Sequence, residues 1–546
     1  MAVGNTRVPV DLRRAIQDLV DYAIDSKILD EHDRIWAYNT TLEATGASTP
    51  GPDGTWALTE ASNTSEVKTD FDLEDILAKL ECVAISNRRI TDTQDGRDRF
   101  AMHVLGTLMP RPSAMISTFE HLFNTEGSRT ATKWFYHICC SAGYVRQAAV
   151  ARNVKWKTAT RWGDLEITIN LSKPEKDPRQ IAAAGKARTS DRTYPTCQLC
   201  IENEGYSGRS ATNANGPHPA RQNLRIIPIK LGGERWGLQY SPYAYFNEHC
   251  IAMSAQHRPM HIDHATIACL LDFVDSFPDY FVGSNADLPI VGGSILSHDH
   301  FQGGAHEFPM MKAKSTVNFS IPGFSSIKGE VLDWPLSTLR LSSTDRREIL
   351  EACDQVIKTW RTWSDETVGI TARTSDGTPH NTITPIVRRI DDQGQQGGNI
   401  YEVYLALRCN ITNQEHPLGV FHPHEQWHHI KRENIGLIEV MGLAILPPRL
   451  MSELAAVRVH ILEAISEHKS EQELLDTLLA DTLSAPHATW AAHIFSQRSF
   501  EFSEQNTMEL LHEEVGIVFS HVLEDAGVFK WDKAGRAAQQ RFIEAL

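Results

Sequence analysis

The sequence predicts an α+β protein in which helical regions at both ends flank a strand-rich middle with two sheet units. Apolar residues recur at helical spacing before residue 150 and after residue 448, whereas between them they alternate with polar residues, as in half-buried strands. The length of 546 residues allows about two to four folding units. We expect a mainly helical region at 1–150, a half carrying the candidate active site at 151–330, and a second half at 331–546 with strands followed by helices.

Before residue 150 the periodicity predicts helices. From Asp11 to Ser26 the apolar residues recur at the spacing of one helix face, which predicts a first helix. Residues 44–64 are rich in glycine, proline, serine and threonine, a composition typical of an exposed loop. Residues 71–80 and 117–143 again show helical spacing, so this region is expected to be mainly helical.

The period changes in the middle of the chain. Leu165, Ile167 and Ile169 alternate with polar residues, as expected of a strand with one buried face. A helix is predicted from about Asp263, a candidate N-cap, to Pro278, which cannot continue a helix. Further strands are predicted at 225–229, 235–240, 250–253 and within 380–412.

The composition limits the class of function. The chain carries 53 Lys and Arg against 69 Asp and Glu, a formal net charge of −16. This balance argues against a general nucleic-acid or membrane-surface binder, because both depend on clustered positive charge. The sequence has no signal-peptide core and no apolar run as long as a membrane span. Together with nine scattered cysteines, it predicts a cytoplasmic protein without nucleic-acid or membrane partners.

The segment 297–304, SHDHFQGG, carries the strongest chemical signal. In an extended backbone His298, His300 and Gln302 share one face. A neutral imidazole can attack phosphorus to give a phosphohistidine-type intermediate, and a glutamine amide can hold a phosphoryl oxygen without titrating. Glycine pairs at 292–293 and 303–304 let a bulky ligand approach the backbone. The segment favours a phosphate site; a metal-binding pair or a surface strand is the alternative.

Two further groups are candidates for metal ligation. Cys197 and Cys200 form a C-x2-C turn, but a tetrahedral zinc site needs two more ligands from elsewhere in the chain. A redox dithiol is the alternative for this pair. The segment His422–His429, HPHEQWHH, is also dense in imidazole and is interpreted either as a polar loop or as a second metal site.

Five stretches of the chain resemble a known family. They are INLSKPEKDP (169–178), YPTCQLCIENEGYSGR (194–209), LQYSPYAYFNEHCIAMSAQHRPM (238–260), FPDYFVGSNADLPIVGGSILSHDHFQGG (277–304) and IKRENIGLIEVMG (430–442). They are similar to the type 2 hexose-1-phosphate uridylyltransferases, the Gram-positive-type branch of galactose-1-phosphate uridylyltransferase in the histidine-triad superfamily. The resemblance covers nearly the whole chain and implies histidine-triad-like antiparallel sheet units in its middle.

The resemblance implies a double-displacement reaction of galactose metabolism. The family moves UMP from UDP-glucose onto an active-site histidine, releases glucose 1-phosphate, and passes UMP to galactose 1-phosphate to give UDP-galactose. These four small molecules are the implied partners, and the family analogy suggests a homodimer. Galactose, glucose and N-acetylhexosamine phosphates all stay open as the preferred acceptor. The alternatives are a histidine-triad nucleotide phosphorylase or hydrolase, and a non-catalytic zinc module that binds nucleic acid, which the negative charge disfavours.

The resemblance also implies roles for individual residues. The type 1 branch carries the motif HPHxQ, whose second histidine is the nucleophile and matches His300. The glutamine that supports the phosphoryl group matches Gln302. In that branch the first histidine of the motif is a structural zinc ligand, together with a C-x2-C pair and one intermediate histidine. The implied zinc ligands are Cys197, Cys200, His257 and His298.

The motif departs from the type 1 pattern at its other positions. Asp299 replaces the proline, and Phe301 replaces the small residue after the nucleophile. The type 1 asparagine ahead of the glycines corresponds to Asn285. Further candidates for contacts with the nucleotide or the sugar, with ordinary polar loop or strand residues as the alternative, are Arg221, Asn223 and Asn247.

Overall fold

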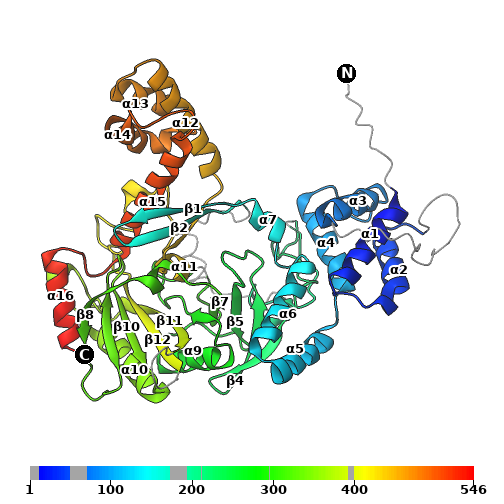
Figure 1. Ribbon diagram of the computed structural model, residues 1–546, viewed down its shortest axis with the longest axis horizontal. Coiled ribbons are helices and arrows are strands. Elements are labelled where there is room, and N and C mark those ends of the chain that lie inside the picture. The colour runs from blue at the N-terminus through cyan, green and yellow to red at the C-terminus, as the bar shows by residue number, and fades with distance from the viewer. Residues whose placement is uncertain (1–10, 49–70, 172–193, 211, 294, 392–398) are drawn as a thin grey trace. The chain divides into compact units, whose positions relative to one another are not determined.

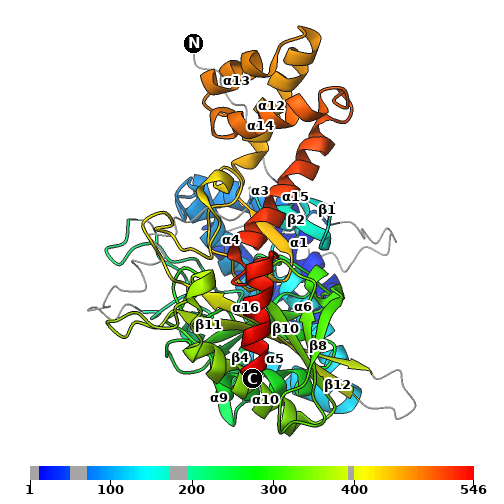
Figure 2. The same cartoon turned by 90° about the vertical axis from the view of Figure 1, so that its left-hand side faces the viewer.

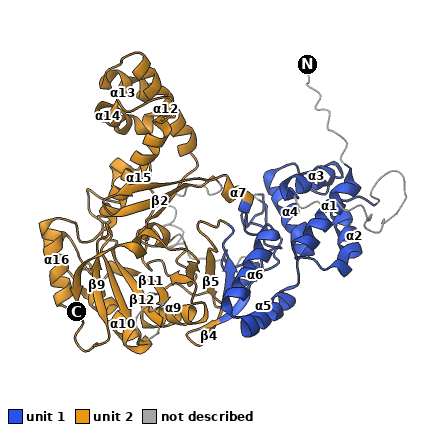
Figure 3. Cartoon of the chain, in the orientation of Figure 1, with its two compact units in different colours: residues 1–147, 191–229, 237–242 blue, residues 148–190, 230–236, 243–546 orange. Residues whose placement is uncertain are grey.

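Figure 1 shows the computed structural model of the protein, which describes residues 11–48, 71–171, 194–210, 212–293, 295–391 and 399–546. The chain divides into two compact units (Figure 3). Unit 1 comprises residues 1–147, 191–229 and 237–242, and unit 2 comprises residues 148–190, 230–236 and 243–546. The region boundaries expected at 150 and 330 stay a prediction.

Unit 1 is built mainly from helices. Helix α1 begins where the sequence predicts, because the Asp11 carboxylate accepts a hydrogen bond from the Arg14 backbone N–H at 3.1 Å, while Ile16 and Leu19 are fully buried. The helix expected at 71–80 is α3, and the loop expected at 44–64 lies mostly outside the described residues. The helices are α1 (Leu12–Asp25), α2 (Arg34–Ala44), α3 (Leu73–Ser86), α4 (Gln94–Leu108), α5 (Pro112–Glu126) and α6 (Ser128–Ser141).

The helical stretch expected at 117–143 is not continuous. It contains the end of α5 and the whole of α6, which are separated by Gly127. The φ angle of this glycine is +94°, a conformation that L side chains rarely adopt and that ends a helix. Helical spacing continues through the break in the sequence, so periodicity alone did not reveal it.

The remaining elements belong mostly to unit 2. The helices are α7 (Gln147–Ala151), α9 (His264–Ser276), α10 (Arg346–Thr362), α11 (Leu437–Val440), α12 (Leu450–Ser466), α13 (Glu471–Ala480), α14 (Ala488–Arg498), α15 (Thr507–Ala526) and α16 (Lys533–Glu544). The strands are β1 (Val154–Thr160), β2 (Gly163–Ile169), β3 (Ile227–Leu231), β4 (Glu234–Tyr240), β5 (Cys250–Ser254), β6 (Phe281–Gly283), β7 (His300–Gly304), β8 (Ser315–Phe319), β9 (Lys328–Leu332), β10 (Thr338–Ser343), β11 (Asn381–Asp391), β12 (Asn399–Cys409) and β13 (Leu443–Leu446). Among the described residues, no helix is both long and apolar enough to cross a membrane.

The strands form two sheets, which confirms the α+β class. In the larger sheet the order is β3-β4-β5-β7-β6-β11-β12-β10-β9-β8, and in the smaller one it is β1-β2-β13. The predicted strands at 225–229, 235–240 and 250–253 correspond to β3, β4 and β5, and the stretch 380–412 contains the long antiparallel pair β11 and β12. Strand β7 lies between β5 and β6, and both of these neighbours run antiparallel to it.

Helices of unit 2 complete its cores. Helix α10 packs on β10, β11 and β12, and α16 lies beside it in Figure 2, where the Phe542 and Trp360 rings meet edge to face at 5.2 Å. Val515 and Phe519 of α15 belong to the same apolar core as the small sheet. Helices α12, α13 and α14 share a smaller core, to which Leu511 of α15 also contributes.

The contact between α15 and β1 yields a stability prediction. A Cβ atom at Gly516 would lie 2.0 Å from Thr158 Oγ1. At an open helical position Gly→Ala stabilises by about 0.5–1 kcal/mol, but here overpacking reverses the sign. We expect Gly516→Ala to lower the free energy of unfolding by about 1–3 kcal/mol, measured as a lower Tm by circular dichroism. Glu509→Ala, at an exposed position of α15, is the control and should change Tm little; a higher Tm for Gly516→Ala would contradict this packing.

Candidate functional site

The candidate site is built around strand β7. In the sheet Gln302 lies opposite Ile251 of β5 and opposite Gly283 of β6, so the backbone of the strand is held along both edges. The extended backbone expected for the motif is confirmed from His300 onward, whereas His298 precedes the strand. The pairing places the side chains of the motif on a rigid element rather than on a loop.

The orientation of the His300 ring is fixed by the backbone before it. His300 is 7% exposed, and its Nδ1 lies 2.8 Å from the carbonyl oxygen of His298. A carbonyl oxygen only accepts hydrogen bonds, so Nδ1 carries the proton and the lone pair of the neutral ring lies on Nε2. The arrangement therefore leaves Nε2 of His300 with the lone pair that a nucleophile needs.

Gln302 is partly exposed and makes one hydrogen bond that orients its amide. Its Oε1 lies 3.0 Å from Nε2 of His249, a histidine that is 2% exposed. Because successive side chains of a strand alternate, Gln302 leaves β7 on the same face as His300. The two functional groups expected from the motif thus lie on one face of one strand.

Asp299 and Phe301, which alternate with these residues, have structural partners. The Arg258 Nε atom donates to the Asp299 carboxylate at 3.3 Å, and another nitrogen of the same guanidinium lies 2.7 Å from Glu234. The Phe301 ring stacks on Trp236 with the ring centroids 4.6 Å apart and the planes inclined by 17°. These contacts give a physical reason for an aspartate and a large aromatic residue at these two positions.

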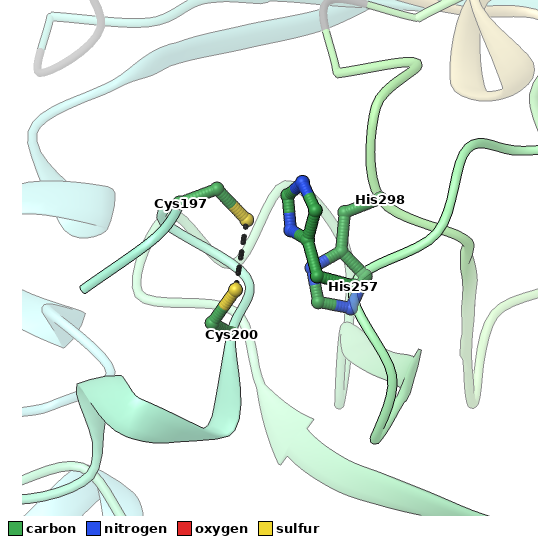
Figure 4. A group of neighbouring side chains, drawn as sticks. All are labelled: Cys197, Cys200, His257 and His298. Atoms are coloured by element: carbon green, nitrogen blue, oxygen red, sulfur yellow. Dashed lines mark hydrogen bonds between the residues drawn. The ribbon is translucent and has the colours of Figure 1, made fainter. Parts of the chain in front are cut away.

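Four side chains converge as a candidate metal centre, which Figure 4 shows. One potential ligand atom of each lies within 4.8 Å of those of the others, and the two sulfurs are 3.5 Å apart. Two of the four side chains are buried, one is half-buried and one is exposed. Sulfur and imidazole donors suit a transition metal rather than Mg²⁺ or Ca²⁺. The members of the group are Cys197, Cys200, His257 and His298.

The chemistry of these donors is consistent with a bound cation. Nε2 of His298 lies 2.8 Å from the carbonyl oxygen of Ser254, which assigns the proton to Nε2 and the lone pair to Nδ1. The hydrogen bond from Cys197 and burial raise the pKa of the Cys200 thiol well above its ordinary value. Two neighbouring thiolates therefore require positive charge between them, which a divalent metal supplies.

Two of the candidate substrate-binding asparagines lie beside strands of the site. Asn285 follows β6, is 5% exposed, and accepts a hydrogen bond from the Leu437 backbone N–H at 2.9 Å. A Cβ atom at Gly293 would lie 2.7 Å from the Asn285 amide nitrogen, so the first glycine pair packs against this side chain. The exposed Asn247 donates to the carbonyl oxygen of Ala305, the residue after β7, at 3.3 Å.

The other two candidates, Arg221 and Asn223, have partners in unit 1. Asn223 is fully buried and donates to the carbonyl oxygen of Ala142 at 2.8 Å. The Arg221 guanidinium carbon lies 5.8 Å from the centre of the Tyr144 ring. These contacts describe structural surroundings, and a role for either side chain in substrate binding stays a prediction.

The histidine-rich segment 422–429 contributes to a pocket of about 840 Å³, which is also lined by His416, Arg432 and Arg449. His428 Nε2 lies 2.9 Å from the carbonyl oxygen of Pro423. Within the described ranges, the Cys/His group above is the one convergent set of three or more metal-ligating side chains. Both interpretations of this segment, a polar loop and a second metal site, therefore stay predictions.

Three residues that contact the site were not predicted: Ser254, Arg258 and His249. Ser254 acts through its carbonyl oxygen, which no side-chain pattern reveals. Arg258 and His249 reach β7 from other parts of the chain, and only the position of β5 next to β7 explains why His249 lies opposite the motif. The signal in the sequence was the strand at 250–253, but its partner strand was not predictable from its own residues.

Comparison with known proteins places the chain among sugar-phosphate enzymes. Residues 55–259 match the model of the galactose-1-phosphate uridyl transferase N-terminal domain, and residues 273–474 match that of the C-terminal domain. The chain is 43% identical to the galactose-1-phosphate uridylyltransferase of Bacillus subtilis (strain 168) over 532 residues, which are 97% of each chain. It is 45% identical over 471 residues to that of Clostridium acetobutylicum, covering 86% of this chain and 89% of the relative. No solved structure matches the chain.

Proposed function

The chain belongs to the galactose-1-phosphate uridylyltransferase family, and we propose that it transfers UMP from UDP-glucose to galactose 1-phosphate, or to a related hexose 1-phosphate, through a uridylyl group on His300. The observation that carries this proposal is the hydrogen bond from His300 Nδ1 to the carbonyl oxygen of His298 at 2.8 Å. It leaves the lone pair on Nε2, which is what attack on phosphorus requires.

In the first half-reaction Nε2 of His300 attacks the α-phosphorus of UDP-glucose. The new N–P bond forms as the P–O bond to the departing glucose 1-phosphate breaks. The ring becomes an imidazolium that keeps its Nδ1 proton, and the carbonyl oxygen of His298 faces that positive charge. No proton has to leave His300 during this step.

In the second half-reaction a phosphate oxygen of galactose 1-phosphate attacks the same phosphorus. The N–P bond breaks, UDP-galactose leaves, and His300 returns to its neutral tautomer. The phosphoanhydride bond of UDP-glucose that breaks and that of UDP-galactose that forms have nearly equal energies. A covalent intermediate therefore allows UMP to be exchanged between the two sugar phosphates without being released. The Gln302 amide supplies uncharged N–H donors for a non-bridging phosphoryl oxygen on the face that it shares with His300.

The surroundings of β7 make Asn285 and Asn247 our candidates for contacts with the nucleotide or the sugar. Asn285 follows β6, and Asn247 is hydrogen-bonded to the residue that follows β7. Arg221 and Asn223 stay predictions in the same role, with their described partners in unit 1.

Zinc is the metal that we assign to Cys197, Cys200, His257 and His298. Two sulfurs bound to one tetrahedral zinc lie about 3.8 Å apart, since each Zn–S bond is about 2.3 Å, and the sulfurs here are 3.5 Å apart. When bound, zinc would supply a fixed crosslink at His298. Because His298 lies two residues before His300 and its carbonyl oxygen orients the His300 ring, this crosslink supports the nucleophile from outside the reacting atoms.

A cytoplasmic location and a homodimer complete the proposal. None of the nine cysteines forms a disulfide, although the sulfurs of Cys197 and Cys200 lie close together, as expected in a reducing compartment. The homodimer rests on family analogy and is tested by sedimentation equilibrium.

The nucleophile assignment predicts a covalent intermediate. Wild-type protein incubated with UDP-glucose labelled at the α-phosphate should retain the label on the protein, and acid should release it because the P–N bond is acid-labile. His300→Ala should lose the label and lower the exchange rate by at least about a thousandfold. The exposed His493→Ala is the matched control and should behave as wild type. If the His300→Ala protein still retained the label, the assignment would be contradicted.

The acceptor decides between transfer and the phosphorylase or hydrolase alternative. Uridylylated protein is mixed with galactose, glucose and N-acetylhexosamine 1-phosphates in parallel. We expect a UDP-sugar to form with galactose 1-phosphate at the highest rate. Rapid release of UMP by water, or of UDP by inorganic phosphate, without any sugar phosphate would contradict the transferase and favour the alternative.

The zinc assignment predicts about one zinc per chain in purified protein, measured by elemental analysis. Cys197→Ser should lose the metal and lower Tm, because the site no longer has four ligands. The half-buried Cys82→Ser on α3 is the matched control and should keep both. Wild-type protein without zinc, together with an unchanged Tm in Cys197→Ser, would contradict this assignment.

A further inference from the structure

His249 is a buried histidine that the mechanism above does not use. It precedes β5 and packs against the rings of Tyr245 and Phe246, whose centroids lie 5.5 and 4.3 Å from its own. Within the described residues its one hydrogen bond joins Nε2 to Gln302 Oε1 at 3.0 Å, and its Nδ1 has no hydrogen-bond partner. The two rings fix the imidazole, and the imidazole in turn contacts Gln302.

The hydrogen bond has only one possible polarity. An amide oxygen accepts hydrogen bonds and cannot donate, so Nε2 of His249 must carry a proton. Burial lowers the pKa of His249 to about 4, so the ring is neutral near pH 7 and Nδ1 bears the lone pair. A buried acceptor without a partner is tolerated better than a buried N–H without one, which agrees with the unpartnered Nδ1.

We propose that His249 is the positioning residue of Gln302: its Nε2–H holds the amide oxygen inward, so that the amide NH2 points to the phosphoryl group on His300. This inference rests on the proposed function. If the Gln302 amide rotated by half a turn, its NH2 would face Nε2 of His249, and the ring would have to carry its proton on Nδ1 instead, a buried position that has no acceptor. His249 therefore selects the amide orientation in which donors, rather than an acceptor oxygen, meet the negatively charged phosphoryl oxygens.

Substitutions test this role through the single-turnover rate of uridylylation by UDP-glucose. His249→Phe keeps a ring between Tyr245 and Phe246 but removes the donor, and we expect the rate to fall about 10–100-fold with little change in the apparent KM. His249→Gln places an amide N–H near the former Nε2 position and should restore most of the rate. If His249 had only a structural role, His249→Gln would not react faster than His249→Phe.

A double-mutant cycle separates positioning from a general effect on the fold. In a Gln302→Ala background His249→Phe should cause no further loss, because the group that it positions is absent. An equal loss in both backgrounds, or no rescue by His249→Gln when Tm is that of wild type, would overturn the inference. Tm of each variant is measured alongside the rate.

A measurement without substrate keeps this inference separate from the proposed function. The ¹⁵N shifts of histidine-labelled wild-type protein should show a neutral ring protonated on Nε2, assigned to His249 by its loss in His249→Gln. A proton on Nδ1 would overturn the inference whatever the enzyme does. If instead the wild-type protein shows the Nε2–H tautomer but forms no uridylyl intermediate, the proposed function is contradicted. In that case the Gln302 amide would not face a phosphoryl group.

Discussion

The site depends on the antiparallel pairing of β7 with both β5 and β6. A strand that is paired on both edges cannot rotate about its axis, so the alternation of its side chains becomes fixed. His300 and Gln302 leave one face, while Phe301 leaves the other and stacks on Trp236. The same pairing brings His249, which precedes β5, against Gln302. One backbone constraint thus determines which groups can meet a phosphoryl group and which groups hold the strand.

Asp299 and Phe301, the two positions at which the motif differs from the type 1 pattern, have partners of their own in the structure. Asp299 is half of an ion pair with Arg258, and Arg258 also contacts Glu234. Through Arg258, the residue after His257, these contacts connect Asp299, just before β7, with Glu234, the first residue of β4. A proline in place of Asp299 would lack this carboxylate. In this chain the two positions are held by an ion pair and by ring stacking.

Local patterns predicted what depends on local sequence. The alternation of apolar and polar residues predicted β2. The apolar spacing from Asp11 and the candidate N-cap Asp263 marked the starts of α1 and α9, and resemblance to the family named the Cys/His group that converges in the structure. The features that the sequence did not predict depend on pairing between distant segments. The partner of Gln302, the carbonyl oxygen that orients His298, and the break at Gly127 follow from strand order and backbone angles, and no single segment encodes them.

In the proposed mechanism, the net charge of −16 and an anionic nucleotide sugar are compatible because recognition at the reacting phosphorus would rely on neutral groups. There His300 would act through a lone pair and Gln302 through amide N–H groups, and His249 is neutral because burial lowers its pKa to about 4. The nearby cation Arg258 is already paired with two carboxylates, so it adds little field. Neutral donors act through orientation rather than through charge. If the proposed mechanism holds, the residues that orient His300 and Gln302 should therefore affect the rate as much as the residues that touch the substrate.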